Sequence, residues 1–181
     1  MSIDITQIEK GFSEREKILD GLLSDNRSIV RSCSNAIKAM HAHDMKEARK
    51  HLAEARRGVE RVIAHEREFP EQLNHILQEY AEAQIVLSAI EENRIPSFSE
   101  LGISAIPYLN GLLDAVGEFK REMYESLRHG DKKKAERYFD MMEEIYDSLL
   151  PLRFSNAILP EFRRKQDSAR HQIEQARGEL L

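Results

Sequence analysis

Apolar residues recur at spacings of three and four along nearly the whole chain, and this periodicity constrains the fold more than any other feature. Such spacing places apolar side chains on one face of an α-helix, whereas a half-buried strand needs strict alternation. The first part of the chain therefore predicts one long helix. Its apolar series is Ile5, Ile8, Phe12, Leu19, Leu22, Leu23, Ile29, Val30, Cys33, Ile37 and Met40.

Turn signals divide the rest of the chain into further helices. Asp44 is typical of an N-cap, and Glu47 three residues later completes a capping-box pattern. His129-Gly130-Asp131 combines a glycine C-cap with an aspartate N-cap. Short connections predict antiparallel neighbours, so we expect an all-α, six- to seven-helix up-down bundle forming one domain over 1–181. The later helices are expected over about 45–67, 70–93, 107–128, 132–149 and 155 to the end, with a loop over 94–105 and a break at Pro160.

Composition agrees with long amphipathic helices and narrows the class of protein. Apolar residues make up 41% of the chain and charged residues 33%, with only 8 Gly and 5 Pro, which argues against disorder and against a β-rich fold. The single cysteine, Cys33, fits a reducing compartment, and no signal peptide or membrane-spanning run is visible. We therefore expect a soluble cytoplasmic protein. A net charge of -5 disfavours coating of nucleic acid by bulk charge.

Four carboxylates on the middle helices are the candidate functional residues. Glu79 and Glu82 are three residues apart, and Asp114 and Glu118 are four apart, so each pair shares a helix face away from the main apolar stripe. Taken singly, either pair is more typical of a solvated surface. However, the first pair has apolar neighbours, and Gly111 and Gly117 interrupt the helix that carries the second. Each internal glycine costs a helix about 1 kcal/mol, which a close approach of another backbone or a ligand would explain.

Convergence of the two pairs would create a site for a hard divalent cation. Four negative charges that lie close together must take up protons or be neutralised by cations. Carboxylate oxygens favour Mg²⁺ or Mn²⁺, and such an ion activates water for hydrolysis of a phosphate ester. A di-iron bundle is the competing interpretation, but it needs Glu-x-x-His motifs, and no histidine here has a glutamate three residues before it.

Around these carboxylates the sequence resembles the translin superfamily, and specifically translin-associated factor X. The likeness covers roughly residues 70–180, while the first 65 residues match only as long amphipathic helices. The segments that carry it are Leu77-Gln78-Glu79-Tyr80-Ala81-Glu82-Ala83, the run from Pro107 to Glu118, Ile145-Tyr146-Asp147-Ser148-Leu149 and Arg177-Gly178.

The resemblance implies a seven-helix bundle that assembles into a hollow octameric barrel. Members of the factor X type are Mg²⁺-dependent endoribonucleases whose active sites face the interior. In eukaryotes they pair with translin, a nucleic-acid-binding subunit that lacks the catalytic carboxylates. The catalytic and metal-binding positions carry over as Glu79, Glu82 and Asp114, with Glu118 matching the fourth acidic position. We expect a self-sufficient homo-octamer of a prokaryotic relative that acts on mainly single-stranded RNA.

Basic residues supply candidate contacts for RNA phosphates. Arg56, Arg57 and Arg61 lie on the helix before the first acidic pair and are the preferred candidates. A second cluster, residues 163–165, opens the last helix and is ranked lower, since such clusters are usually solvated or ion-paired. His75, one turn before Glu79, is expected to be a solvent-facing polar residue rather than a ligand.

Three hypotheses for function therefore remain open. The first is a Mg²⁺-dependent endoribonuclease that uses the four carboxylates. The second is a non-catalytic single-stranded RNA- or DNA-binding protein of translin type, which overall acidity slightly disfavours. The third is a helical interaction protein in which the acidic pairs are merely solvated. The first depends on whether the helices that carry the two pairs face each other.

Overall fold

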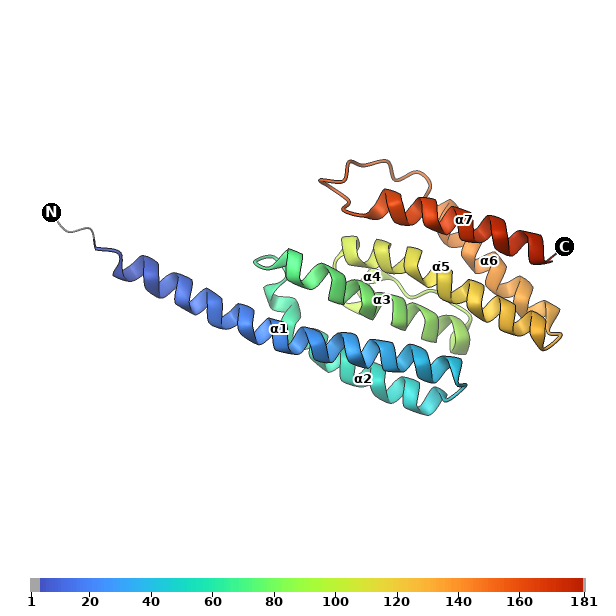
Figure 1. The fold of residues 1–181 in the computed structure, drawn as a ribbon, viewed down its shortest axis with the longest axis horizontal. Helices are drawn as coiled ribbons and strands as arrows, with labels where there is room; N and C mark the ends of the chain where they lie inside the picture. Colours follow the sequence, from blue (N-terminus) through green and yellow to red (C-terminus); the bar gives the residue numbers. More distant parts are fainter. Residues whose placement is uncertain (1–3, 181) are drawn as a thin grey trace. The chain divides into compact units, whose positions relative to one another are not determined.

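The computed structural model describes residues 4–180, and within them it contains seven α-helices, one 3₁₀ helix and no strand (Figure 1). The expectation of an all-α fold is confirmed. The chain forms two compact units, one up to Ile76 and the other from Leu77 on. A single domain over 1–181 stays a prediction. The helices are α1 Thr6–His41, α2 Met45–Val62, η1 Ile63–His65, α3 Pro70–Glu92, α4 Phe98–Leu101, α5 Ala105–Arg128, α6 Lys132–Leu149 and α7 Phe162–Leu180.

The first unit is built on the antiparallel pair of α1 and α2, which lie side by side in Figure 1. Their turn contains the expected N-cap, because the Asp44 side chain accepts a hydrogen bond of 3.1 Å from the Glu47 backbone N–H. The Glu47 carboxylate instead pairs with Lys50 at 3.0 Å. The Asp44 N–H already donates to the Ala39 carbonyl, so it does not need the reciprocal bond of a capping box.

Two helix boundaries and one loop differ from the sequence-based expectation. α2 ends at Val62 instead of about 67, because the chain tightens into the 3₁₀ helix before it turns toward α3. The expected loop over 94–105 contains α4, a short helix with a complete capping box between Ser97 and Glu100. The last helix begins at Phe162, not near 155, since the Asn156 side chain accepts from the Glu161 backbone N–H and holds the preceding residues in turns.

The second unit is organised around α5. This helix packs against α6 and α7, which also pack against each other, and all three lie together in Figure 1. The side chains Phe119 and Tyr138 stack between α5 and α6 with their ring centroids 6.0 Å apart. The part of α3 from Leu77 on contacts α5 on a further side, through Ala81 and Gly111. α5 thereby positions both neighbours that contribute to the candidate site.

No helix in the described part of the chain combines the length and the apolar character needed to cross a membrane.

Candidate metal and phosphate site

The structure brings carboxylates from the two middle helices to one cavity. Glu79 and Glu82 of α3 and Asp114 of α5 line a space of about 320 Å³ within the second unit. Glu118, one turn beyond Asp114 on α5, does not line this cavity, but its charge acts on Glu82. α3 and α5 therefore face each other at these carboxylates. The hypothesis of a metal site required this arrangement.

Gly111 explains how closely the two helices approach. A Cβ atom at this position would lie 2.7 Å from the Ala81 Cβ and 2.9 Å from the Gln78 carbonyl oxygen. Both distances are shorter than a van der Waals contact, and neither atom belongs to the flexible end of a side chain. Only glycine allows α5 to lie this close to α3, so that Asp114, less than one turn later, comes within reach of Glu79 and Glu82.

Gly117, the second glycine of α5, serves a different neighbour. A Cβ atom there would lie 3.2 Å from the Oε1 atom of Gln172, which belongs to α7. The glycine thus leaves room for an α7 side chain that lines the same cavity as Asp114. Gly111 therefore allows α3 to approach one side of α5, and Gly117 leaves room for α7 on another side.

α7 places a lysine directly on the acidic cluster. The Lys165 ammonium lies 2.5 Å from one oxygen of Asp114 and 2.7 Å from the other. Gln78 of α3 donates a further hydrogen bond of 2.6 Å to the Asp114 carboxylate. The Lys165 and Asp114 side chains are only 15% and 25% exposed, so this ion pair is largely removed from water. Asp114 is thereby linked to both neighbouring helices.

One lysine does not balance the charge of the cluster, and Glu82 shows the effect. The pKa of Glu82 is raised from its ordinary value near 4.5 to about 8. Burial is the largest cause, the charges of Asp114, Glu79 and Glu118 contribute in the same direction, and Lys165 opposes them. Four carboxylates are therefore close enough to interact electrostatically. In the absence of another cation, the site holds a proton on Glu82 at neutral pH.

The remaining wall of the cavity consists mainly of hydrogen-bond donors from α7. Arg164, Lys165, Ser168 and Gln172 all line it, and their spacing places them on one face of the helix. Arg164 is also paired with Glu161 at 2.6 Å. The cavity thus has oxygen acceptors on the side of α3 and α5 and polar donors on the side of α7.

Lys165 lines the candidate site, and the sequence did not predict this role. The sequence indicates Lys165 only as a member of the lower-ranked basic cluster at residues 163–165. The sequence did contain a signal. The buried residues of α7 are Phe162, Ala169, Ile173 and Ala176, and Lys165 lies on the same stripe, three residues after the first and four before the second. A lysine on the buried face of a helix requires a partner, and here the partner is Asp114.

The preferred RNA-contacting arginines lie on α2, in the first unit. Arg56 pairs with Glu60 at 3.4 Å, and Arg61 pairs with Asp25 of α1 at 2.8 Å. Arg57 is exposed, and its backbone carbonyl accepts a hydrogen bond from Arg61. Nothing in these contacts tests their role in RNA binding, which stays a prediction. His75 is exposed, as expected.

The donor set of the carboxylate cavity fits Mg²⁺ in its chemistry. Three carboxylates line one space and a fourth lies nearby, and these are the hard oxygen ligands that Mg²⁺ and Mn²⁺ prefer. Within residues 4–180, however, no group of three or more His, Cys, Asp or Glu side chains is already arranged to hold a metal ion. In this arrangement both oxygens of Asp114 are engaged by Lys165.

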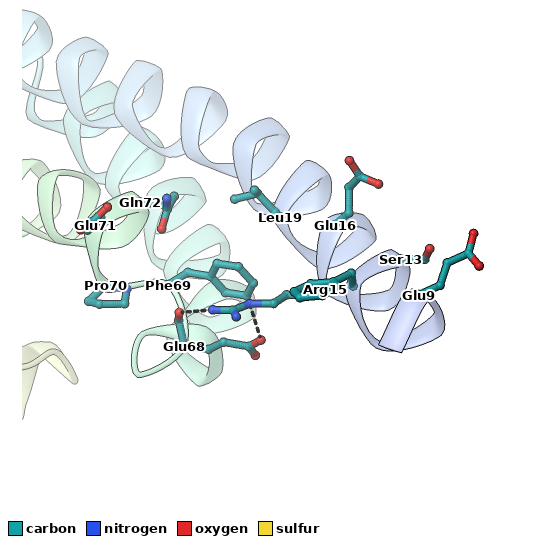
Figure 2. A pocket seen from close by; sticks show the side chains of 11 residues that line it. Glu9, Ser13, Arg15, Glu16, Leu19, Glu68, Phe69, Pro70, Glu71 and Gln72 are labelled. Carbon is teal, nitrogen blue, oxygen red and sulfur yellow. Dashed lines mark hydrogen bonds and ion pairs between the residues drawn. The ribbon is translucent and has the colours of Figure 1, made fainter. Parts of the chain in front are cut away.

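A larger cavity, of about 750 Å³, lies in the first unit between α1 and the segment that leads into α3 (Figure 2). Arg15 occupies one wall, with its guanidinium 5.2 Å from the centroid of the Phe69 ring and its Nε atom 3.2 Å from the Glu68 carboxylate. These groups already satisfy one another. Glutamates line this larger cavity too, so acidic residues alone do not distinguish the two cavities. The smaller one is the better candidate for chemistry, because its carboxylates are partly buried and lie close enough together to raise the pKa of Glu82.

Comparison with known proteins identifies the class to which this fold and site belong. The sequence pattern described as the Translin family matches residues 22–176. The chain belongs to the translin family. The resemblance inferred from the acidic segments is therefore confirmed, and the match extends over most of α1 and all of α2, where the sequence alone showed only amphipathic helices.

Individual relatives agree with this assignment. An uncharacterised protein of Methanocaldococcus jannaschii, MJ0175, is 31% identical over 173 residues, which are 93% of this chain and 78% of that protein. The structure of AfC3PO in complex with duplex RNA is similar with a TM-score of 0.90 and 31% identity, over 98% of this chain and 95% of that one. Apo-NeC3PO is similar with a TM-score of 0.88 and 26% identity, over 99% and 97% of the two chains.

Proposed function

We propose that the protein is a Mg²⁺-dependent endoribonuclease. The observation that supports this most is the convergence of carboxylates from α3 and α5 on one cavity that also has polar donors from α7. A structural neighbour is a complex with duplex RNA, which supports RNA as the ligand class. Single-stranded RNA, implied by the resemblance to factor X, is the preferred substrate.

The proposed chemistry assigns the ion to Glu79, Glu82, Asp114 and Glu118. Mg²⁺, when bound, supplies positive charge for the phosphodiester and lowers the pKa of a coordinated water. The chain's own residues hold the site in shape: Gln78 donates to Asp114 and fixes its carboxylate, and Gly111 keeps α3 and α5 close enough for their carboxylates to act together. A divalent cation bound there would favour the ionised form of Glu82, whose pKa is raised in its absence.

The test is cleavage of a labelled single-stranded RNA with Mg²⁺, with Mn²⁺ and with chelator, by wild type and Asp114→Ala. We expect cleavage by wild type only when a divalent ion is present, and none by the variant. Internal cuts distinguish an endonuclease from an exonuclease. Wild type without activity in either metal, or a variant that cuts equally well, contradicts the proposal.

Non-catalytic binding of single-stranded RNA or DNA is the second candidate. It is favoured by the engagement of Asp114 with Lys165, which leaves the described carboxylates without an arrangement ready for metal. Binding of an oligonucleotide that is unchanged by chelator, combined with absence of cleavage, would support this function over the first.

We also propose that the protein forms a homo-oligomer, with the octamer of the factor X resemblance as the preferred size. α1 supports this, because its first turns expose Ile5, Ile8 and Phe12. Contiguous exposed apolar residues are typical of protein interfaces. Sedimentation equilibrium measures the assembly directly, and a monomer at micromolar concentration would contradict it.

A further inference from the structure

Lys165 is the basic side chain that bonds to Asp114, and it occupies both oxygens of that carboxylate. The two distances, 2.5 and 2.7 Å, are those of short charge-assisted hydrogen bonds. Gln78 donates a third bond to the same group. Together these donors use most of the acceptor capacity of a carboxylate, which has about four lone-pair sites.

A metal ion at Asp114 needs the lone pairs that Lys165 now takes. An ammonium and a divalent cation also repel each other strongly at such separations in a partly buried site. Lys165 and a bound ion would therefore compete for Asp114. In the metal-free cluster Lys165 supplies the counter-charge.

If Lys165 leaves Asp114, the cavity has room for an anion that could bind it instead. On α7, the acceptors that line this space are the Ser168 hydroxyl and the Gln172 amide oxygen, and both are neutral. A released Lys165 therefore finds no charged partner among them, and Arg164 adds a further donor. An anion with several oxygens would satisfy these donors together. A phosphodiester has this chemistry, and a space of about 320 Å³ accommodates one.

We propose that Lys165 exchanges partners: it holds Asp114 in the metal-free protein, gives way when a divalent cation binds the carboxylates, and then binds a phosphate oxygen of the RNA. This inference rests on the proposed function and adds a substrate-binding residue to it. In this proposal the carboxylates of α3 and α5 bind the metal ion, and the polar side chains of α7 bind the phosphate in the same cavity.

Lysine labelling followed by mass spectrometry tests the exchange without measuring activity. Reductive methylation of the full-length protein modifies accessible, unpaired amines. We expect Lys165 to react slowly without metal, and about fivefold or more faster with saturating Mg²⁺, as the paired state is depopulated. A single-stranded oligoribonucleotide with phosphorothioate linkages should then restore protection. Lys132 and Lys133, at the start of α6, provide internal controls whose labelling should not change with metal.

Variants distinguish the effect of the contact between Lys165 and Asp114 from the effect of changing the net charge of α7. Lys165→Gln removes the competing ammonium, and we expect it to bind Mg²⁺ about tenfold more tightly by calorimetry. It should also bind the phosphorothioate RNA more weakly. Arg163→Gln, an equal change of charge at the exposed neighbouring position of α7, should alter neither affinity more than twofold. Asp114→Asn should make Lys165 reactive even without metal.

The outcomes distinguish this inference from the proposed function. If calorimetry shows Mg²⁺ binding and RNA is cut, but labelling of Lys165 does not respond to the metal, the exchange is wrong and the nuclease stands. If the metal releases Lys165 but RNA does not protect it, the phosphate contact is wrong. If neither Mg²⁺ binding nor cleavage is detected, the proposed function fails, and Lys165 is a permanent structural cation.

Discussion

Two aspartates in this protein bind a basic side chain from a distant part of the chain, and their surroundings differ. Asp25 of α1 meets Arg61 of α2 at 2.8 Å, with side chains 33% and 57% exposed. Asp114 of α5 meets Lys165 of α7 at 2.5 Å, with both side chains mostly covered. Asp25 and Arg61 carry one negative and one positive charge, which balance on the surface, whereas Asp114 and Lys165 lie near three additional carboxylates.

The difference indicates which ion pair is the better candidate for a role beyond stability. A surface pair gains little from its partner, because water screens both charges. The Asp114 pair leaves an excess of negative charge in a cavity, and this charge adds to the larger effect of burial in raising the pKa of Glu82. A protein that only needed to join α5 to α7 would not place four acids around one lysine. The predictions below compare these two regions.

The largest effect is expected from Asp114→Asn in an RNA-cleavage assay. The variant keeps the shape of the side chain but loses the charge that binds metal, so the rate with Mg²⁺ should fall by at least about 100-fold, or ~2.7 kcal/mol in the barrier. Asp25→Asn is the matched control and should stay within about twofold at saturating RNA, because its pair is exposed. Equal losses from both variants would remove the distinction between the two regions.

A large dependence of stability on pH is expected in metal-free protein. The folded-state pKa of Glu82 is raised, to about 8, so its favourable contribution is present below the unfolded value near 4.5 and is lost as pH rises toward 8. The free energy of unfolding should therefore decrease over this range, by at most about 1.4 kcal/mol per pH unit from this one group. Denaturant titrations at several pH values measure it.

Glu82→Gln is the variant that tests this assignment. The amide cannot ionise, so the decrease in stability between about pH 5 and 8 should become smaller. Saturating Mg²⁺ should have a similar effect on wild type, since it neutralises the same carboxylates. A variant with the same pH profile as wild type would show that another group is responsible.

A smaller loss of stability is expected from Gly111→Ala. The new Cβ would lie 2.7 Å from the Ala81 Cβ, so α3 and α5 must move apart, at a cost of roughly 1–3 kcal/mol less the gain in helix propensity. Gly117→Ala should cost less, because the neighbouring atom is the end of the Gln172 side chain. Gly21→Ala on α1 should stabilise by about 1 kcal/mol, since no atom lies within 4 Å. Thermal unfolding ranks the three.

The smallest effect is expected from Arg61→Ala. Its ion pair with Asp25 is exposed, so the free energy of unfolding should change by less than about 1 kcal/mol. If Arg61 also contacts RNA, the affinity should fall, and the slope of affinity against salt concentration should decrease by about one. Filter binding at several salt concentrations separates this from a purely structural role, in which affinity would not change.

The sequence predicted the helices well because their apolar spacing and their caps are local. The first helix, the N-caps at Asp44 and Asp131, and the helices over 70–93 and 132–149 all agree closely with the structure. The predicted helix boundaries are wrong where tight turns precede or follow a helix. The late start of α7 depends on the Asn156 side chain and on a left-handed Glu161, with φ of 63°, which no periodicity reveals.

The candidate site was predictable from sequence only in part. Gly111 and Gly117 signalled a close approach, but not that the two face different helices. The carboxylate pairs were visible, whereas their meeting depends on a contact between α3 and α5 that spacing along the chain cannot show. Lys165 is separated from Asp114 by 51 residues, so only its place on the buried stripe of α7 could have indicated a partner.

The start of α7 at Phe162 has a kinetic consequence. Lys165 belongs to the first turn of this helix, and its N–H makes a 3.1 Å bond to the Glu161 carbonyl. Helix ends open far more often than helix centres, and they do so without unfolding the rest of a protein. The ammonium that pairs with Asp114 is thus carried by the first turn of α7. Its flexible four-carbon side chain can leave Asp114 by rotation about its own bonds, so the proposed exchange needs no motion of the core around α5.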